Sequence, residues 1–158
     1  MTLPVARPAR PGDAAELLRL RAQLHSGLNA PEPWHATFLT EMRERLGTDP
    51  NLLAFVTDAD GGRLAACAIG LLYRAYDGPI YTGGQWGRIH SVVTAPDHRR
   101  QGHGEAVTRA LILALQQAGC ASVELNATDD GLPLYAKLGF TPADRYLTLH
   151  QPLDGGAA

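Results

Sequence analysis

The segment VVTAPDHRRQGHG, residues 92–104, decides the fold and carries the densest chemical signal in the sequence. An apolar strand ends in a turn that opens directly into an amphipathic helix, which we expect over residues 102–118. The first backbone N–H groups of such a helix lack intrahelical acceptors and carry the positive end of its dipole. Gly102 and Gly104 allow positive φ and close approach of a ligand, and consecutive loop amides can form an anion-binding nest. The segment, with its two adjacent arginines, therefore predicts a site for a phosphate or pyrophosphate.

The hydrophobic pattern on either side of this segment predicts an α/β fold. We expect a mixed sheet of six to seven strands with helices on both faces. In the strand that precedes the loop, period-2 alternation assigns Ile89, Ser91 and Val93 to one face and His90 and Val92 to the other. The expected strands are 3–7, 51–57, 63–73, 87–94, 122–126 and 146–150, and the expected helices are 13–25, 34–46, 102–118 and 132–138.

The composition is that of an ordinary globular domain. The chain has 158 residues, of which 45% are hydrophobic and 19% are charged, with a net charge of −2. We therefore expect one domain over residues 1–153 with a flexible tail over 154–158, and no affinity for nucleic acid. No signal peptide or membrane span is recognisable, and Cys67 and Cys120 are interpreted as reduced core thiols, which favours the cytoplasm. The scattered histidines and cysteines do not predict a metal site.

A second motif, NATDDGLPLYAKLGF at residues 126–140, strengthens the interpretation of the loop. The order Arg-x-x-Gly-x-Gly at residues 99–104, followed about thirty residues later by Leu-Tyr-x-Lys-Leu-Gly-Phe, resembles the GCN5-related N-acetyltransferase (GNAT) superfamily. The resemblance is strong over residues 87–140 and covers the first eighty residues only in the order of elements. It implies the GNAT fold, with acetyl-CoA as cofactor and coenzyme A as product.

The resemblance also implies a set of cofactor-binding residues. In the family, the strand before the loop splays away from the next parallel strand, and pantetheine pairs with its backbone in the cleft. Asn126 is either a cofactor ligand or a turn residue that satisfies its own backbone. Carried over position by position, the cofactor-binding residues are Val92, Val93, Thr94, Arg99, Arg100, Gln101, Gly102, His103, Gly104, Asn126 and Tyr135.

Acetyl transfer to an amine needs a neutral amine, a polarised thioester carbonyl and a proton for the departing thiolate. Tyr135, at the family position of the general acid, is the expected proton donor, and the backbone amide of Val93 is the expected oxyanion donor. The family often uses a carboxylate base near this strand, but residues 85–95 contain none. His90 is the candidate base because an imidazole titrates near neutral pH, and a water molecule is the alternative.

The acceptor is a small-molecule or peptide amine whose identity the sequence leaves open. Aromatic residues in the first two helices and the middle hairpin are candidates to line its pocket. An alternative function is an acyl-CoA sensor or interaction domain of the same fold without catalysis. A homodimer is a further expectation, because the last strand offers a pairing edge. The expected acceptor-binding residues are Trp34, Tyr73, Tyr81 and Trp86.

Overall fold

A computed structural model of the protein describes residues 2–25, 29–143 and 147–150. The chain divides into two compact units, residues 1–126 and 127–158, and each is described by itself. The predicted tail over 154–158 lies outside the described residues.

The first unit is built on a mixed sheet with strand order β1-β2-β3-β4-β5. The pairs β1–β2, β2–β3 and β3–β4 are antiparallel, and β4–β5 is parallel. The strands are β1 (Arg7–Pro8), β2 (Leu52–Asp58), β3 (Leu64–Arg74), β4 (Gln85–Thr94) and β5 (Ser122–Leu125).

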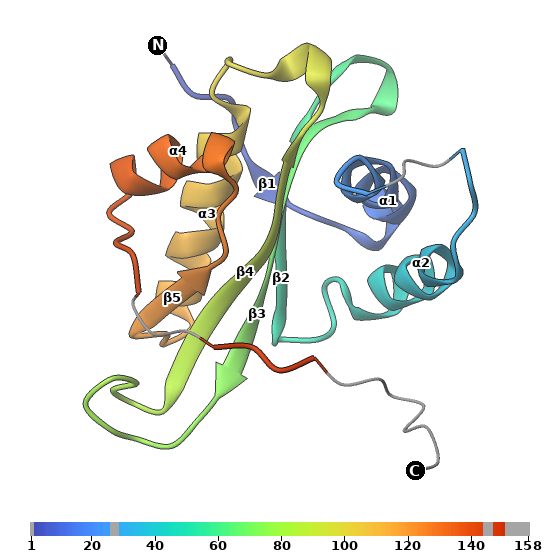
Figure 1. Ribbon diagram of the computed structural model, residues 1–158. Coiled ribbons are helices and arrows are strands. Elements are labelled where there is room, and N and C mark those ends of the chain that lie inside the picture. The colour runs from blue at the N-terminus through green and yellow to red at the C-terminus, as the bar shows by residue number, and fades with distance from the viewer. Residues whose placement is uncertain (1, 26–28, 144–146, 151–158) are drawn as a thin grey trace. The chain divides into compact units, whose positions relative to one another are not determined.

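Helices cover both faces of this sheet, as the sequence predicted (Figure 1). The helices α1 and α2 lie on one face, and α3 lies on the other. The core on the α1 face is continuous from the helices through β2 and β3 to Val93 on β4. The helices are α1 (Ala14–Ala22), α2 (Pro33–Arg45) and α3 (His103–Gln117), with single 3₁₀ turns at η1 (Pro11–Asp13), η2 (Asp60–Gly62) and η3 (Pro96–His98).

A β-bulge at His90 interrupts the alternation of β4. Ile69 of β3 is opposite Ser91, and the next residue, Gly70, is opposite Ile89, which leaves His90 as the extra residue. One extra residue reverses the faces of everything beyond it. The sequence assignment of Ile89 to the same face as Ser91 is therefore wrong.

Contacts on each side of the bulge confirm this reversal. A Cβ atom placed on Gly87 would lie 2.8 Å from Cδ1 of Leu115, so Gly87, and Ile89 two residues on, face α3. Ser91, in contrast, accepts a hydrogen bond from Arg21 of α1. Beyond the bulge, therefore, the side chains of Ser91 and Val93 face α1.

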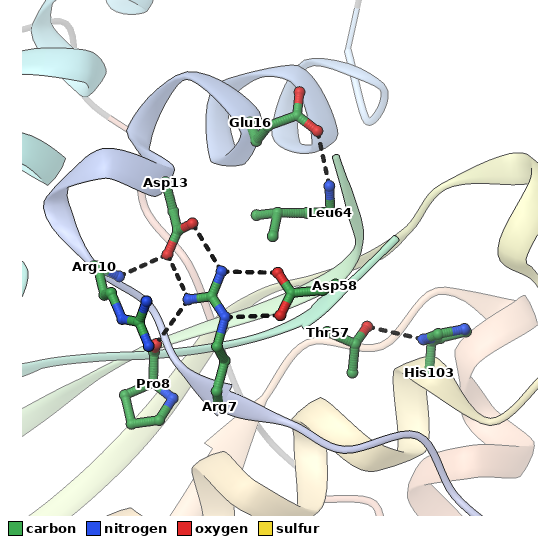
Figure 2. A network of polar contacts seen from close by, with 9 residues as sticks. All are labelled: Arg7, Pro8, Arg10, Asp13, Glu16, Thr57, Asp58, Leu64 and His103. Carbon is green, nitrogen blue, oxygen red and sulfur yellow. Dashed lines mark hydrogen bonds and ion pairs between the residues drawn. The ribbon is translucent and has the colours of Figure 1, made fainter. Parts of the chain in front are cut away.

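In addition to its pairing with β2, the N-terminal strand is held by the side chain of Arg7 (Figure 2). The Arg7 guanidinium donates to both carboxylate oxygens of Asp13, at 2.9 and 3.0 Å, and to both of Asp58, at 2.9 Å each. Desolvation raises the pKa of Asp13, but the hydrogen bonds from Arg7 and from the Arg10 N–H outweigh it, and the bonds from Arg7 likewise hold the pKa of Asp58 below its usual range. Arg7 thereby joins the start of α1 to the end of β2.

The second unit contains η4 (Asp129–Gly131) and α4 (Leu132–Lys137). Gly131 lets the Tyr135 ring lie against the backbone, because a Cβ on Gly131 would come within 2.8 Å of that ring. The Tyr135 ring also packs edge-to-face on Phe140, with centroids 5.8 Å apart.

The sheet has five strands in the described part of the chain, where the sequence predicted six to seven. The first strand covers only Arg7–Pro8, where residues 3–7 were expected, and Pro4 in the expected range has no N–H to donate to a ladder. Tyr146 lies outside the described residues, and residues 147–150 form no strand. The pairing edge predicted from that strand is therefore not formed by residues 147–150.

Candidate active site

The sheet opens where β4 approaches the loop. The parallel pairing of β4 with β5 ends at Ile89, opposite Leu125. Strand β4 continues for five more residues to Thr94, paired only with β3 on its other side. The bulge at His90 lies where this pairing ends, and β5 itself ends at Leu125, so residues 90–94 of β4 have no strand on that edge among the described residues.

Backbone alternation decides which groups face the opening. Ala95 N–H donates to Ala65 of β3 at 2.8 Å, and the direction of backbone groups alternates along an extended strand. The N–H and C=O of Val93 therefore face β3. Those of Val92 and Thr94 face the side from which β5 has departed. Of the three backbone positions predicted to meet the cofactor, two are thus directed at the opening and Val93 is not.

The loop after β4 adopts the backbone conformation of an anion nest. Arg100 has φ of 63°, the only positive φ at a non-glycine residue in the described chain, and Gly102 caps α3 with φ of 86°. The first helical hydrogen bond of this turn is donated by Ala106 to Gly102 O. Among the described residues, the N–H groups from 100 to 104 have no protein acceptor. The strained arginine and the glycine together expose a row of donors.

Hydrogen bonds of the loop side chains hold this turn in place. His103 Nδ1 lies 2.9 Å from the hydroxyl of Thr57, which is 1% exposed in β2 (Figure 2). Arg99 Nε donates to Thr94 O at 3.4 Å, and Gln101 Nε2 donates to Asp97 O at 3.2 Å. The His103 side chain is therefore an anchor to the sheet. Its predicted contribution to the cofactor site rests on its backbone N–H.

Three of the four predicted acceptor-binding residues come together beside the bulge. Tyr73 stacks on Trp86 with ring centroids 4.5 Å apart, and Tyr81 stacks on the same indole at 5.6 Å. The Tyr73 hydroxyl lies 2.9 Å from His90 Nε2, and the Tyr81 hydroxyl donates to Glu124 at 3.2 Å. The stack forms an aromatic wall that ends at the candidate base.

The imidazole of His90 is neutral at physiological pH. Desolvation, followed by the charges of Arg88 and Arg21, lowers its pKa below the usual value. A neutral imidazole can accept a proton, which a general base requires. The hydrogen bond between its Nε2 and the Tyr73 hydroxyl fixes the orientation of the His90 imidazole.

Trp34, the fourth predicted residue, lines a separate open pocket of about 470 Å³ between α1 and α2. Arg21 of α1 also lines it and had not been singled out from the sequence. Its guanidinium lies 5.8 Å from the Trp34 ring centroid and 5.7 Å from that of Phe38, and donates to Ser91 beside the bulge. The signal was present in the pattern, because Arg21 is four residues after buried Leu17, on the inward stripe of the helix.

Asn126 and Tyr135 follow β5. Asn126 is exposed directly after the strand and makes no hydrogen bond within the described residues. Partial burial raises the pKa of Tyr135, which keeps the phenol protonated at neutral pH. Tyr135 is thus able to donate a proton.

No cluster of three or more potential metal ligands is found among the described residues, and none of their helices is long and apolar enough to cross a membrane. Cys67 and Cys120 are buried free thiols, and burial raises the pKa of Cys67 to about 12. Neither thiol is a nucleophile at neutral pH.

Comparison with known proteins gives consistent results. The acetyltransferase (GNAT) family model matches residues 16–140. Glucosamine 6-phosphate N-acetyltransferase 1 of Oryza sativa subsp. japonica is 34% identical over 105 residues, which cover 66% of this chain and 61% of the rice protein. The chain thus matches about three fifths of that relative's length.

Solved structures share the fold over almost the whole chain. An acetyltransferase of Trypanosoma brucei is 25% identical with a TM-score of 0.72, covering 92% of this chain and 98% of that protein. A predicted acetyltransferase from Clostridium acetobutylicum, solved with acetyl-CoA, is 20% identical with a TM-score of 0.76, covering 92% of this chain and 94% of that one.

Proposed function

This chain belongs to the acetyltransferase (GNAT) family, and we propose that it transfers the acetyl group of acetyl-CoA directly to a primary amine of a small molecule. The observation that carries the proposal is the end of β4–β5 pairing at Ile89 and Leu125, followed by an unpaired edge of β4 and then by the loop amides from 100 to 104 that have no acceptor among the described residues. We propose further that residues 1–153 act as one catalytic domain, since the family model spans 16–140 and so includes parts of both units.

The described residues fit acetyl-CoA in two places. The unpaired N–H groups from 100 to 104, with the exposed Arg99 and Arg100 side chains, suit a pyrophosphate. The outward backbone groups of Val92 and Thr94 suit the two amides of a pantetheine arm, which would pair with β4 as an added strand. When bound, acetyl-CoA supplies the acetyl thioester.

The protein groups then have separate roles. We assign the oxyanion donor to the N–H of Val92, the first outward amide after the bulge, in place of Val93, whose N–H faces β3. A donor fixed in advance at that position stabilises the charge that develops on the acetyl oxygen. His90 takes a proton from the acceptor ammonium or amine, directly or through water. Tyr135 donates a proton to the departing thiolate, a role that rests on the family motif and its raised pKa.

A small-molecule acceptor is favoured by the names of the curated relatives. Two of them are glucosamine 6-phosphate N-acetyltransferases, from rice and from Trypanosoma brucei brucei. The aromatic wall of Tyr73, Tyr81 and Trp86 supplies apolar area for the body of such an acceptor next to His90.

Titration calorimetry with acetyl-CoA tests the proposal, using wild type, the double variant Arg99→Ala/Arg100→Ala, and Arg43→Ala as a matched control on exposed α2. We expect binding that weakens at least about tenfold, or roughly 1.4 kcal/mol, in the double variant only. An acetyl-transfer screen over amines, amino sugars and their phosphates, and peptides follows. A folded protein that does not bind millimolar acetyl-CoA would rule the function out.

A further inference from the structure

The pocket between α1 and α2 contains a cation, Arg21, that has no anionic partner among the described residues. Five arginines in the described chain are partly buried, and four of them pair with carboxylates of the protein. Arg21 is the exception: its one polar partner is the hydroxyl of Ser91. The five are Arg7, Arg19, Arg21, Arg45 and Arg88.

The guanidinium of Arg21 is nevertheless held in position. It lies against the rings of Trp34 and Phe38, at 5.8 and 5.7 Å from their centroids, and donates to Ser91. These contacts reduce the rotational freedom that an arginine loses on binding a ligand. A partly buried and preoriented guanidinium without a carboxylate partner is a receptor for a carboxylate or phosphate.

The position of Arg21 ties this receptor to the candidate site of acetyl transfer. Ser91 directly follows the bulge residue His90, and the charge of Arg21 is one of the causes that lower the pKa of His90. An amine seated at His90 therefore lies within reach of Arg21 by another of its own groups. The nearby positive charge also disfavours the ammonium form of the acceptor and so favours the reactive free amine.

Two carboxylates limit where negative charge is accepted. Glu32 and Glu41 also line the pocket, and Glu32 accepts a hydrogen bond from Trp34 Nε1 at 2.8 Å. Negative charge spread along the acceptor would meet them and be repelled. The pocket thus suits one anionic group at the Arg21 end and polar or cationic groups beyond it.

Resting on the proposed function, we infer that the acceptor is a primary amine bearing one anionic group, a carboxylate or a phosphate, that binds to Arg21. Arg21 then determines specificity for the acceptor and has no contact with the proposed acetyl-CoA loop. The shared chemistry is a small oxyanion presented to a guanidinium.

The test compares two matched acceptor pairs: L-phenylalanine with L-phenylalaninamide, and glucosamine 6-phosphate with glucosamine. Values of kcat/KM are measured for wild type, Arg21→Gln, Arg21→Lys and the control Arg43→Gln, at fixed ionic strength. The ratio of anionic to neutral acceptor, compared between variants, cancels differences in amine pKa. Melting temperature and acetyl-CoA affinity are recorded for each variant.

We expect wild type to prefer the anionic member of one pair by about 10- to 100-fold, the range for a hydrogen-bonded charge pair. Arg21→Gln removes this preference, Arg21→Lys keeps part of it, and Arg43→Gln keeps it all. The pair that responds identifies the anion as carboxylate or phosphate. No anionic preference in either pair, or a preference that survives in Arg21→Gln, overturns the inference.

Failure of this inference is distinguishable from failure of the proposed function. Acetylation of neutral and anionic amines at equal rates leaves the acetyltransferase intact and removes the role of Arg21. If none of the four compounds is acetylated, they are titrated against the coenzyme A-saturated protein by calorimetry. Anionic compounds that bind no better than their neutral partners then also overturn the inference.

Discussion

Replacing Val92 by proline removes one backbone N–H and tests the assignment of the oxyanion donor directly. The N–H of Val92 faces the side that β5 has left, so it contributes nothing to the β3 ladder. Proline is tolerated in a strand where the N–H faces away from a partner. The neighbouring variant, Val93→Pro, removes an N–H that faces β3, and Val92→Ala changes the side chain while keeping the amide.

The structure sets different magnitudes for the three variants. Loss of one oxyanion donor costs about 100- to 1000-fold in kcat, so Val92→Pro is expected in that range. Because the fixed φ of proline is compatible with a strand and no ladder hydrogen bond is lost, the change in stability is expected to stay within about 1 kcal/mol, or about 2–4 °C in Tm for a chain of this size. Val93→Pro also leaves a buried carbonyl of β3 unsatisfied, for a total of about 3 kcal/mol and a fall of about 6–12 °C. Val92→Ala is expected to retain kcat within about threefold, since its donor is intact.

The assay is steady-state acetyl transfer followed by thiol release, with Tm from circular dichroism and the acetyl-CoA Kd from calorimetry. The Kd separates loss of pantetheine pairing from loss of oxyanion stabilisation. A folded Val92→Pro protein with a near wild-type kcat would refute the donor assignment. A Val93→Pro protein more stable than Val92→Pro would refute the backbone alternation on which the assignment rests.

Three further variants test the base, the loop anchor and the packing behind β4. In wild type, kcat/KM should fall as the pH drops below the pKa of His90, which is lowered from 6.5, because the imidazolium cannot accept a proton. The variant His90→Gln should be about 100- to 10,000-fold slower, and its kcat/KM should no longer show this fall at low pH. If His90→Gln has the same pH profile as wild type, water is favoured as the base. Thr57→Val removes the hydroxyl that lies 2.9 Å from the His103 ring nitrogen. Differential scanning calorimetry should show that the free energy of unfolding falls by about 1–3 kcal/mol, and acetyl-CoA binding should weaken. A variant as stable as wild type would mean that this contact does not stabilise the fold. Gly87→Ala places a methyl group within 2.8 Å of Leu115 and should lower the free energy of unfolding in urea by about 1–3 kcal/mol. The double variant Gly87→Ala/Leu115→Val should lose less stability than the sum of the two single variants. Additive losses would contradict the contact between residues 87 and 115.

The conformation of the loop that we propose for the cofactor could be predicted from the sequence because its parts are local. The strand end, the nest and the first turn of α3 occupy residues 92–104, and the residue type of the glycines there indicates their conformation. Even the one surprise, positive φ at Arg100, falls inside that segment. The fold class followed from the same order of elements.

The bulge could not be predicted, because alternation alone has no means of counting an extra residue. Residues 87–94 read as an uninterrupted strand, and the period-2 pattern gave a single assignment of faces. The pairing with β3 breaks that period at His90 and reverses Ser91 and Val93 relative to Ile89. Beyond the bulge, the Ala95–Ala65 hydrogen bond directs the N–H of Val93 to β3 and that of Val92 outward, which is why we propose Val92 in place of Val93 as the oxyanion donor.

The proposed acceptor side is assembled from distant parts of the chain, so its proposed chemistry rests on contacts that the structure alone supplies. Arg21 and Ser91 are 70 residues apart, and Tyr81 meets Glu124 across 43. A cation on the inward stripe of α1 signals a buried partner, but the sequence cannot say whether that partner belongs to the protein. Among the described residues the polar partner is only the hydroxyl of Ser91, and we therefore propose that the acceptor supplies the negative charge. The two sides of the site thus make separable predictions, since Arg21 should affect the choice of acceptor while the loop arginines should affect acetyl-CoA binding.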